Sequence, residues 1–255
     1  MEDQAIRLIV EPGVARITIA RPPLNILTLE AIEALAAAVE EVNQTAHLKA
    51  VVLAAEGRAF CAGLAVEDHL GARAKPMLTA FHRVFRALHR LECATVAAVQ
   101  GAALGGGAEL ATFCDVVIAS EHATFGQPEI KVGVFPPIAA LHYPDRIGRA
   151  RTLQLLLSGE ALTARDAERI GLIDRVVPPG ELAAALEAML GGLTDKSAAV
   201  LRLTKRAVRR AGDDGFDAAL SQLEDLYLNE LMRTEDAGEG LGAFLAKRRP
   251  AWKDR

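Results

Sequence analysis

The chain has 255 residues, of which 51% are hydrophobic, and a formal net charge of -4 at pH 7. This length can bury a sizeable core as one large domain or two small ones, and the mild negative charge gives no support for binding nucleic acid or an anionic membrane surface. The three cysteines show no zinc-ligand or disulfide-framework spacing, so the composition favours small-molecule chemistry in a reducing compartment.

The N-terminal part is predicted to form a hairpin followed by a helix. Two β-rich runs flank a Pro-Gly turn in residues 6–25, and the proline pair 22–23 ends the second run. Thr28 is the predicted N-cap of an amphipathic helix over residues 29–44. Because the first ten residues lack a signal-peptide pattern and no apolar stretch of about 18 residues is free of charge, we expect a soluble cytoplasmic protein.

The middle of the chain alternates strands with loops and helices. Short buried strands are predicted for residues 49–55 and 94–101, a loop for residues 57–70, and helices for residues 77–91 and 108–115. Two strands followed by a helix recur about three times along the chain. This order predicts an α/β architecture rather than an all-β fold or a helical bundle.

The last quarter of the chain is predicted to be helical. We therefore divide the chain into a core of residues 1–190 and a helical region of residues 191–255. The apolar stripes of this region need a partner, and we expect that partner to be another subunit. The predicted amphipathic segments are residues 181–193, 197–211 and 216–234.

Three consecutive glycines, residues 105–107, stand between a predicted strand and a predicted helix, and Glu109 follows them. They let the backbone approach a ligand closely, and the helix start exposes N–H groups at its positive end. Gly107 and Ala108 stand where a Walker loop needs lysine and serine or threonine, and Leu110 stands where a dinucleotide site needs glycine. An oxyanion that develops on a thioester suits these donors better. From this run alone, tight strand-helix packing explains the glycines equally well.

A second acid, Glu129, follows Pro128 in another apolar stretch, FGQPEI. Taken alone, a solvated loop acid is the more usual explanation. Two acids that each follow a rigid element in apolar surroundings predict a pair whose mutual repulsion and burial separate their pKa values. One carboxyl can then stay protonated while the other is ionised, as concerted acid-base chemistry requires.

Four motifs occur in one order: RAFCAGLAVEDH, AAVQGAALGGGAELATFCDVVIAS, ATFGQPEIKVGVFP and GLGAFLAKRRPAWKD. Together they resemble the crotonase superfamily, and specifically its enoyl-CoA hydratases, over essentially the whole chain. The resemblance implies a spiral of repeated ββα units with C-terminal helices that assemble homotrimers, commonly paired into homohexamers. It implies a lyase acting on acyl-CoA, with coenzyme A as part of the substrate and no metal or redox cofactor.

The resemblance also implies residue roles. The backbone N–H groups of Leu64 and Gly106 would form an oxyanion hole around the thioester carbonyl, and Glu109 and Glu129 match the two catalytic glutamates of the family. One water would lie between them. Glu109 would act as base while the water oxygen attacks the β-carbon, and Glu129 would deliver a proton to the α-carbon.

Coenzyme A binding departs from the family pattern. Hydratases often carry a lysine where this chain has Pro23, and another basic residue where it has Glu67. Ala62 and Lys247 are therefore the predicted CoA contacts, with Lys247 at a phosphate. An ordinary basic surface around Lys247 and Arg248 is the alternative.

The acyl end of the site is expected in residues 133–144, where many hydratases have a small, glycine-rich stretch. Phe135 and Pro136 should reshape this end, and Phe81 and Phe85 are further pocket candidates, for which core packing is the alternative. These segments look most similar to the cyclohexa-1,5-dienecarbonyl-CoA hydratases of anaerobic aromatic degradation. A cyclic dienoyl-CoA is thus the predicted substrate.

Two rival functions remain open. A Δ3,Δ2-enoyl-CoA isomerase needs one base and no attacking water, and the presence of both glutamates disfavours it. A non-catalytic protein that binds acyl-CoA or RNA belongs to a different class, and the charge gives no support for RNA. Outside the motifs, His82 and His89 are interpreted as a solvated face, and Cys61 of the first motif is interpreted as a packing residue.

Overall fold

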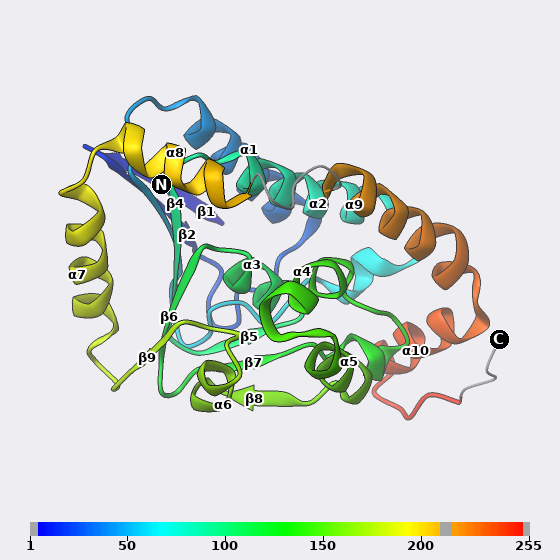
Figure 1. Cartoon of the computed structure of the whole chain (residues 1–255). Helices are drawn as coiled ribbons and strands as arrows, with labels where there is room; N and C mark the ends of the chain where they lie inside the picture. Colours follow the sequence, from blue (N-terminus) through cyan, green and yellow to red (C-terminus); the bar gives the residue numbers. More distant parts are fainter. Residues whose placement is uncertain (1–4, 210–215, 252–255) are drawn as a thin grey trace.

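The computed structural model describes residues 5–209 and 216–251, and a six-stranded sheet forms the centre of that part of the chain (Figure 1). The first two strands are the predicted antiparallel hairpin, and each further strand joins in parallel. Across the sheet the strands are β1 (Ile6–Glu11), β2 (Val14–Ile19), β3 (Ala50–Ala55), β4 (Ala94–Val99), β6 (Val116–Ser120) and β9 (Arg175–Val177).

The chain forms a spiral because it passes repeatedly between the large sheet and a second, smaller sheet. The chain passes directly from β4 to β5 and from β6 to β7, so each turn adds one strand to each sheet. The isolated bridges Leu27↔Leu64 and Cys61↔Ala103 continue this stacking through the earlier turns. The loops of successive turns therefore lie against one another. The smaller sheet holds β5 (Ala102–Leu104), β7 (Thr124–Gly126) and β8 (Ala161–Thr163).

Both faces of the large sheet are covered, which explains the uninterrupted apolar runs in its strands. Val51 and Leu53 of β3 face the main core, where α1 (Leu29–Gln44) packs against α2 (Ala74–Arg90). Ala50 and Val52, which alternate with them, pack against α7 on the other face (Figure 1). Helix α7 comprises Leu182–Thr194.

Short helices follow the smaller sheet and surround the region described below. They are α3 (Gly106–Thr112), α4 (Pro137–Ile147), α5 (Arg149–Ser158) and α6 (Ala164–Arg169).

The predicted capping of α1 is wrong in one respect. Thr28 does occupy the N-cap position, but its side chain makes no capping hydrogen bond. The carboxylate of the buried Asp68 instead accepts the N–H of Leu29 at 2.9 Å. A residue from a distant loop thus replaces the expected local cap.

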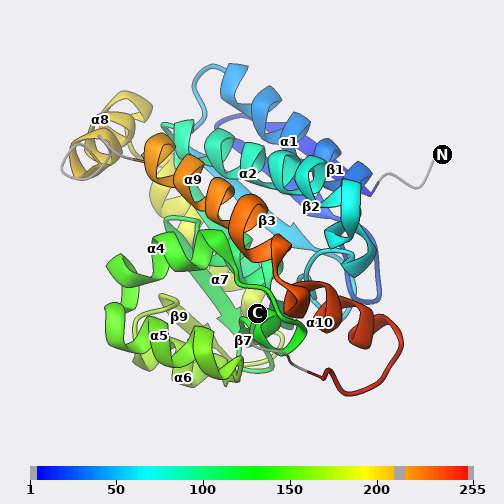
Figure 2. The same cartoon turned by 90° about the vertical axis from the view of Figure 1, so that its right-hand side faces the viewer.

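The predicted C-terminal helices form, and α9 runs back along α2 (Figure 2). Glu224 fastens the two helices, because its carboxylate lies 2.9 Å from Nδ1 of His82 and 3.1 Å from the Arg86 guanidinium. A π-helical turn over Leu226–Glu230 and a 3-10 turn over Leu231–Arg233 then lead to the last helix. The C-terminal helices are α8 (Ala198–Arg209), α9 (Phe216–Asp225) and α10 (Glu235–Leu245).

The predicted division near residue 190 falls inside α7, a helix that packs on the core sheet. The division itself stays a prediction. Residues 210–211 of one predicted helix and residues 252–254 of the last motif lie outside the described residues. Among the described helices, none is both long and apolar enough to cross a membrane.

Candidate active site

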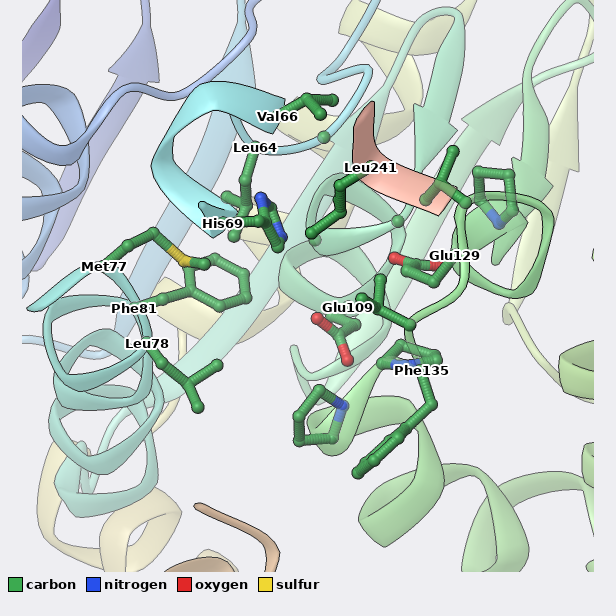
Figure 3. A pocket seen from close by; sticks show the side chains of 18 of the residues that line it. Leu64, Val66, His69, Met77, Leu78, Phe81, Glu109, Glu129, Phe135 and Leu241 are labelled. Carbon is green, nitrogen blue, oxygen red and sulfur yellow. The ribbon is translucent and has the colours of Figure 1, made fainter. Parts of the chain in front are cut away.

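The glycine run, the Glu129 turn and the C-terminal helices enclose one cavity of about 300 Å³ (Figure 3). Side chains of α2, among them Met77 and Phe81, face Glu109 and Glu129 across this space. Leu241 reaches it from α10. Residues more than 150 positions apart in the sequence therefore share one enclosed site.

Each of the three glycines faces a close neighbour. A Cβ at Gly105, whose φ is +53°, would lie 2.6 Å from Oε1 of Glu129, and one at Gly106 would lie 2.8 Å from Cζ of Phe81. A Cβ at Gly107 would lie 2.1 Å from the carbonyl oxygen of Cys61. The positive φ at Gly105 and the backbone contact at Gly107 favour glycine, whereas a Cβ at Gly106 would require the Phe81 ring to move. The run is the point at which the loop, α2 and the second acid converge.

Glu109 lies on α3 and is 2% exposed. Its Oε1 accepts the N–H of Ala139 at 2.8 Å, at the start of α4. Burial raises the pKa of Glu109 to about 7, although the N–H groups of Ala139 and Ile138 act in the opposite direction. This carboxyl can exchange a proton near neutral pH.

Glu129 lies in the 3-10 turn Pro128–Val132, directly after β7. Burial, and next the charge of Glu109, raise its pKa to about 8. Figure 3 shows both carboxyl groups reaching into the same cavity. Burial thus raises the pKa of both carboxyls, and repulsion from Glu109 adds to this at Glu129.

A buried hydrogen-bond chain behind Glu129 was missed by the sequence reasoning. With its nitrogen toward Glu129, the Gln127 amide donates to the two carboxyl oxygens at 3.2 and 3.3 Å, and its oxygen accepts from the Tyr143 hydroxyl at 2.7 Å. This orientation satisfies both ends of the amide. Gln127 and Tyr143 are each 1% exposed. Gln127 adjoins Glu129 in the FGQPEI motif, but Tyr143 offered no signal of its own.

Two backbone N–H groups remain available at the cavity. Leu64 and Gly106 both line it, and the Cβ position of Gly106 lies 3.1 Å from the Leu64 side chain. The bridge to Leu27 uses the N–H of Ala65 rather than that of Leu64, and Gly106 is the first residue of α3. Within residues 5–209 and 216–251, neither N–H donates a hydrogen bond.

The predicted acyl-pocket residues separate into two groups. Phe81, Phe135 and Pro136 line the cavity, but Phe85 does not. Phe85 is fully buried and packs edge-on against Phe81 and Phe113, so its assignment to the pocket is wrong. The helical stripe could not distinguish the two phenylalanines of α2 because both face inward.

Several apolar lining residues were not anticipated. Those on α2 share the helical face of Phe81, and Leu241 and Phe244 lie in the fourth motif without having been singled out as lining residues. The residues not anticipated individually are Met77, Leu78, Tyr227, Leu241 and Phe244.

The predicted CoA contacts lie in different places. Ala62 lines the cavity, whereas Lys247 is exposed beyond α10, has a φ of +52°, and is not among the lining residues. Cys61 is buried as predicted, and burial raises the pKa of its thiol to about 12.

Two histidines lie in unexpected places. His69 lines the cavity; its Nδ1 lies 3.1 Å from the Ala65 oxygen, and burial lowers its pKa. His82 is 0% exposed and pairs with Glu224, so the predicted solvated face is wrong at this position. Helix α9 covers it from 142 residues away in the sequence.

Comparisons with known proteins find relatives over almost the whole chain. Residues 10–255 match the family model described as enoyl-CoA hydratase/isomerase. A cyclohexa-1,5-dienecarbonyl-CoA hydratase of Thauera aromatica is 39% identical over 240 residues, 94% of this chain and 93% of the relative. A probable enoyl-CoA hydratase of Mycobacterium bovis is 36% identical over 94% of both chains. The crystal structure of an enoyl-CoA hydratase from Mycobacterium avium subsp. paratuberculosis superposes with a TM-score of 0.88 at 32% identity, over 98% of this chain and 99% of that one.

The chain therefore belongs to the enoyl-CoA hydratase/isomerase family. The predicted resemblance and the crotonase-type α/β spiral are confirmed. So is the prediction of an enzyme of the hydro-lyase class.

Proposed function

We propose that this enzyme adds water to an α,β-unsaturated acyl-CoA thioester, with Glu109 and Glu129 as its acid-base pair. The observation that carries this proposal is the placement of the buried Glu109 carboxyl and the partly buried Glu129 carboxyl, both with raised pKa values, in one cavity beside two unused backbone N–H groups. Hydration needs a base for the water and an acid for the α-carbon. This site offers both, together with donors for the thioester oxygen.

The chemistry proceeds by balanced proton transfers. The N–H groups of Leu64 and Gly106 hold the thioester oxygen as negative charge develops on it, and loss of one such donor costs about 3 kcal/mol of transition-state stabilisation. Ionised Glu109 removes a proton from the water as its oxygen bonds to the β-carbon. Protonated Glu129 gives its proton to the α-carbon. The proton gained by Glu109 then replaces the one lost by Glu129.

For the substrate, we propose a cyclic dienoyl-CoA of the cyclohexa-1,5-dienecarbonyl type. Its support is the Thauera aromatica relative and the bulky apolar wall formed by Phe81, Phe135 and Pro136. Coenzyme A would contact Ala62, and Lys247 would meet a phosphate outside the cavity. Comparing kcat/KM for crotonyl-CoA and the cyclic dienoyl-CoA tests the assignment. A strong preference for crotonyl-CoA would remove the cyclic substrate and leave the hydratase.

Labelled water separates hydration from the rival activities. In oxygen-18 water, a hydratase places the label on the β-carbon, whereas an isomerase yields product without label. Unlabelled, isomerised product would refute the proposal. A gel shift with RNA at physiological salt tests the non-catalytic alternative.

We also propose a homotrimer or homohexamer. Val200, Leu203 and Val208 of α8 are 59%, 54% and 75% exposed, and large exposed apolar side chains on one helix suit a subunit contact. Sedimentation at micromolar concentration would show a mass of three or six chains; a monomer would contradict it.

A further inference from the structure

Tyr227 brings a hydroxyl to the cavity from the C-terminal region. It lies in the π-helical turn after α9 and is 1% exposed. Its ring packs edge-on against Phe135, with ring centroids 5.4 Å apart. Among the described residues that line the cavity, no other carries a hydroxyl group.

The Tyr227 hydroxyl has no hydrogen-bond partner within the described part of the chain. It is also not sealed away, since His82 Nε2 is the sole buried and unpartnered side-chain atom among the described residues. The hydroxyl therefore keeps some accessible surface, and Tyr227 is one of the residues that line the cavity. Burial raises the pKa of Tyr227, and the charges of Glu129 and Glu109 act in the same direction. The phenol is thus a neutral donor at any physiological pH.

The position of Tyr227 is fixed by contacts made one helical turn earlier. Glu224 accepts hydrogen bonds from His82 and Arg86 of α2, and these partners lower its pKa to about 2. The ion pair with Arg86 and the packing of Phe135 hold the phenol from two sides. A fixed donor with no internal acceptor is typical of a group that meets a ligand.

We propose that the Tyr227 hydroxyl donates a hydrogen bond to the oxygen held between Glu109 and Glu129. That oxygen belongs to the attacking water in hydration and to the β-hydroxyl of the product. The inference rests on the proposed function and adds a third group on the reacting oxygen. In the reverse direction, the same donation meets the leaving β-oxygen while protonated Glu109 returns its proton to that oxygen, so that water departs, and Glu129 takes the proton from the α-carbon.

Tyr227→Phe tests the contact because it removes the hydroxyl and keeps the ring. We expect kcat/KM to fall about tenfold in both directions, as for loss of one hydrogen bond: in hydration through kcat, with KM for the enoyl-CoA within about twofold, and in dehydration through a higher KM for the hydroxyacyl-CoA. The melting temperature should not fall, since the hydroxyl has no partner in the folded chain. Unchanged kcat/KM in both directions would overturn the proposal.

A binding measurement makes the test independent of turnover. In the Glu109→Gln background, with and without Tyr227→Phe, calorimetry compares 3-hydroxybutyryl-CoA with butyryl-CoA. Tyr227→Phe should weaken binding of the hydroxyacyl ester about tenfold and leave butyryl-CoA within about twofold. Equal weakening of both esters, or of neither, would overturn the contact. A wild-type enzyme that hydrates no enoyl-CoA would refute the proposed function, while this comparison would still decide on Tyr227.

Discussion

Two walls of the cavity differ in how they are built. The glycine-turn wall consists of residues 62–64, 105–109 and 128–129, whereas the C-terminal wall consists of Tyr227, Leu241 and Phe244. Glycines set the first wall, because a Cβ at each of the three would lie 2.1 to 2.8 Å from a neighbouring atom, which at Gly107 is the main-chain oxygen of Cys61. Side-chain packing between distant helices sets the second, and Phe244 is still 53% exposed. Local backbone thus places the two carboxyls, whereas tertiary packing places the opposite wall.

The largest loss of activity is expected when a carboxyl group is removed from the glycine-turn wall. Glu109→Gln and Glu129→Gln should each lower kcat by about a hundredfold or more, because each removes an acid-base group. Binding of a CoA ester should stay nearly intact. Steady-state kinetics and calorimetry on the same preparations measure both. Wild-type turnover in either variant would refute its role.

A backbone test asks whether this wall tolerates one methyl group. Gly107→Ala should destabilise the fold by about 2 kcal/mol, since its Cβ would overlap the Cys61 carbonyl. Gly191→Ala is the matched control in α7, where a Cβ meets nothing within 4 Å, and it should stabilise by about 0.5 kcal/mol. Urea unfolding compares the two. Equal stabilities would show that the close approach imposes no constraint.

The pH dependence sharpens the roles of the two acids. The active form has Glu109 ionised and Glu129 protonated, so kcat/KM should rise through about pH 7 and fall above about pH 8. Each limb should change about tenfold per pH unit. A profile flat from pH 5 to 9 would contradict the assignment.

The raised pKa values of Glu109 and Glu129 also make the stability of the fold depend on pH. Both folded-state pKa values lie above the ordinary 4.5, so the neutral carboxyls favour folding below that pH and this contribution is lost as pH rises through 7 and 8. Glu129→Gln should therefore raise the melting temperature more at pH 9 than at pH 5. The opposite order would show that Glu129 is not buried as an acid.

The smallest effect is expected from substitutions on α2, where Phe81 lines the cavity and Phe85 packs in the core. Phe81→Leu should change the ratio of kcat/KM between cyclic and linear enoyl-CoA substrates about fivefold, because Phe81 lines the cavity. Phe85→Leu should leave that ratio unchanged and cost about 1 kcal/mol of stability, since it packs only in the core. Substrate competition assays and urea unfolding distinguish them. A similar change of ratio in Phe85→Leu would place it at the acyl group.

The glycine-turn wall could be predicted because its signals are local. Glu109 and Glu129 lie 20 positions apart, each beside a rigid element, and the spiral brings consecutive turns together. The family resemblance then named Leu64 and Gly106 as donors. The order of strands and helices followed from periodicity in the same way.

The place of the C-terminal wall at the cavity could not be predicted, because tertiary packing alone brings these helices there. The sequence predicts a solvated His82 because the contact with α9 comes from a distant segment, and Tyr227 has the pattern of an ordinary residue of an amphipathic helix. Phe81 and Phe85 lie on one apolar stripe of α2, and they differ only in that the cavity reaches Phe81 and not Phe85. The cap of α1 by Asp68 belongs to the same class of distant contact.

A crystal structure with a bound, unreactive acyl-CoA would test the shared site of the two acids most directly. We predict one ordered water that lies about 2.6–3.2 Å from a carboxyl oxygen of Glu109 and from one of Glu129, next to the β-carbon. Carboxyl groups that bind separate waters, with none in common, would contradict it.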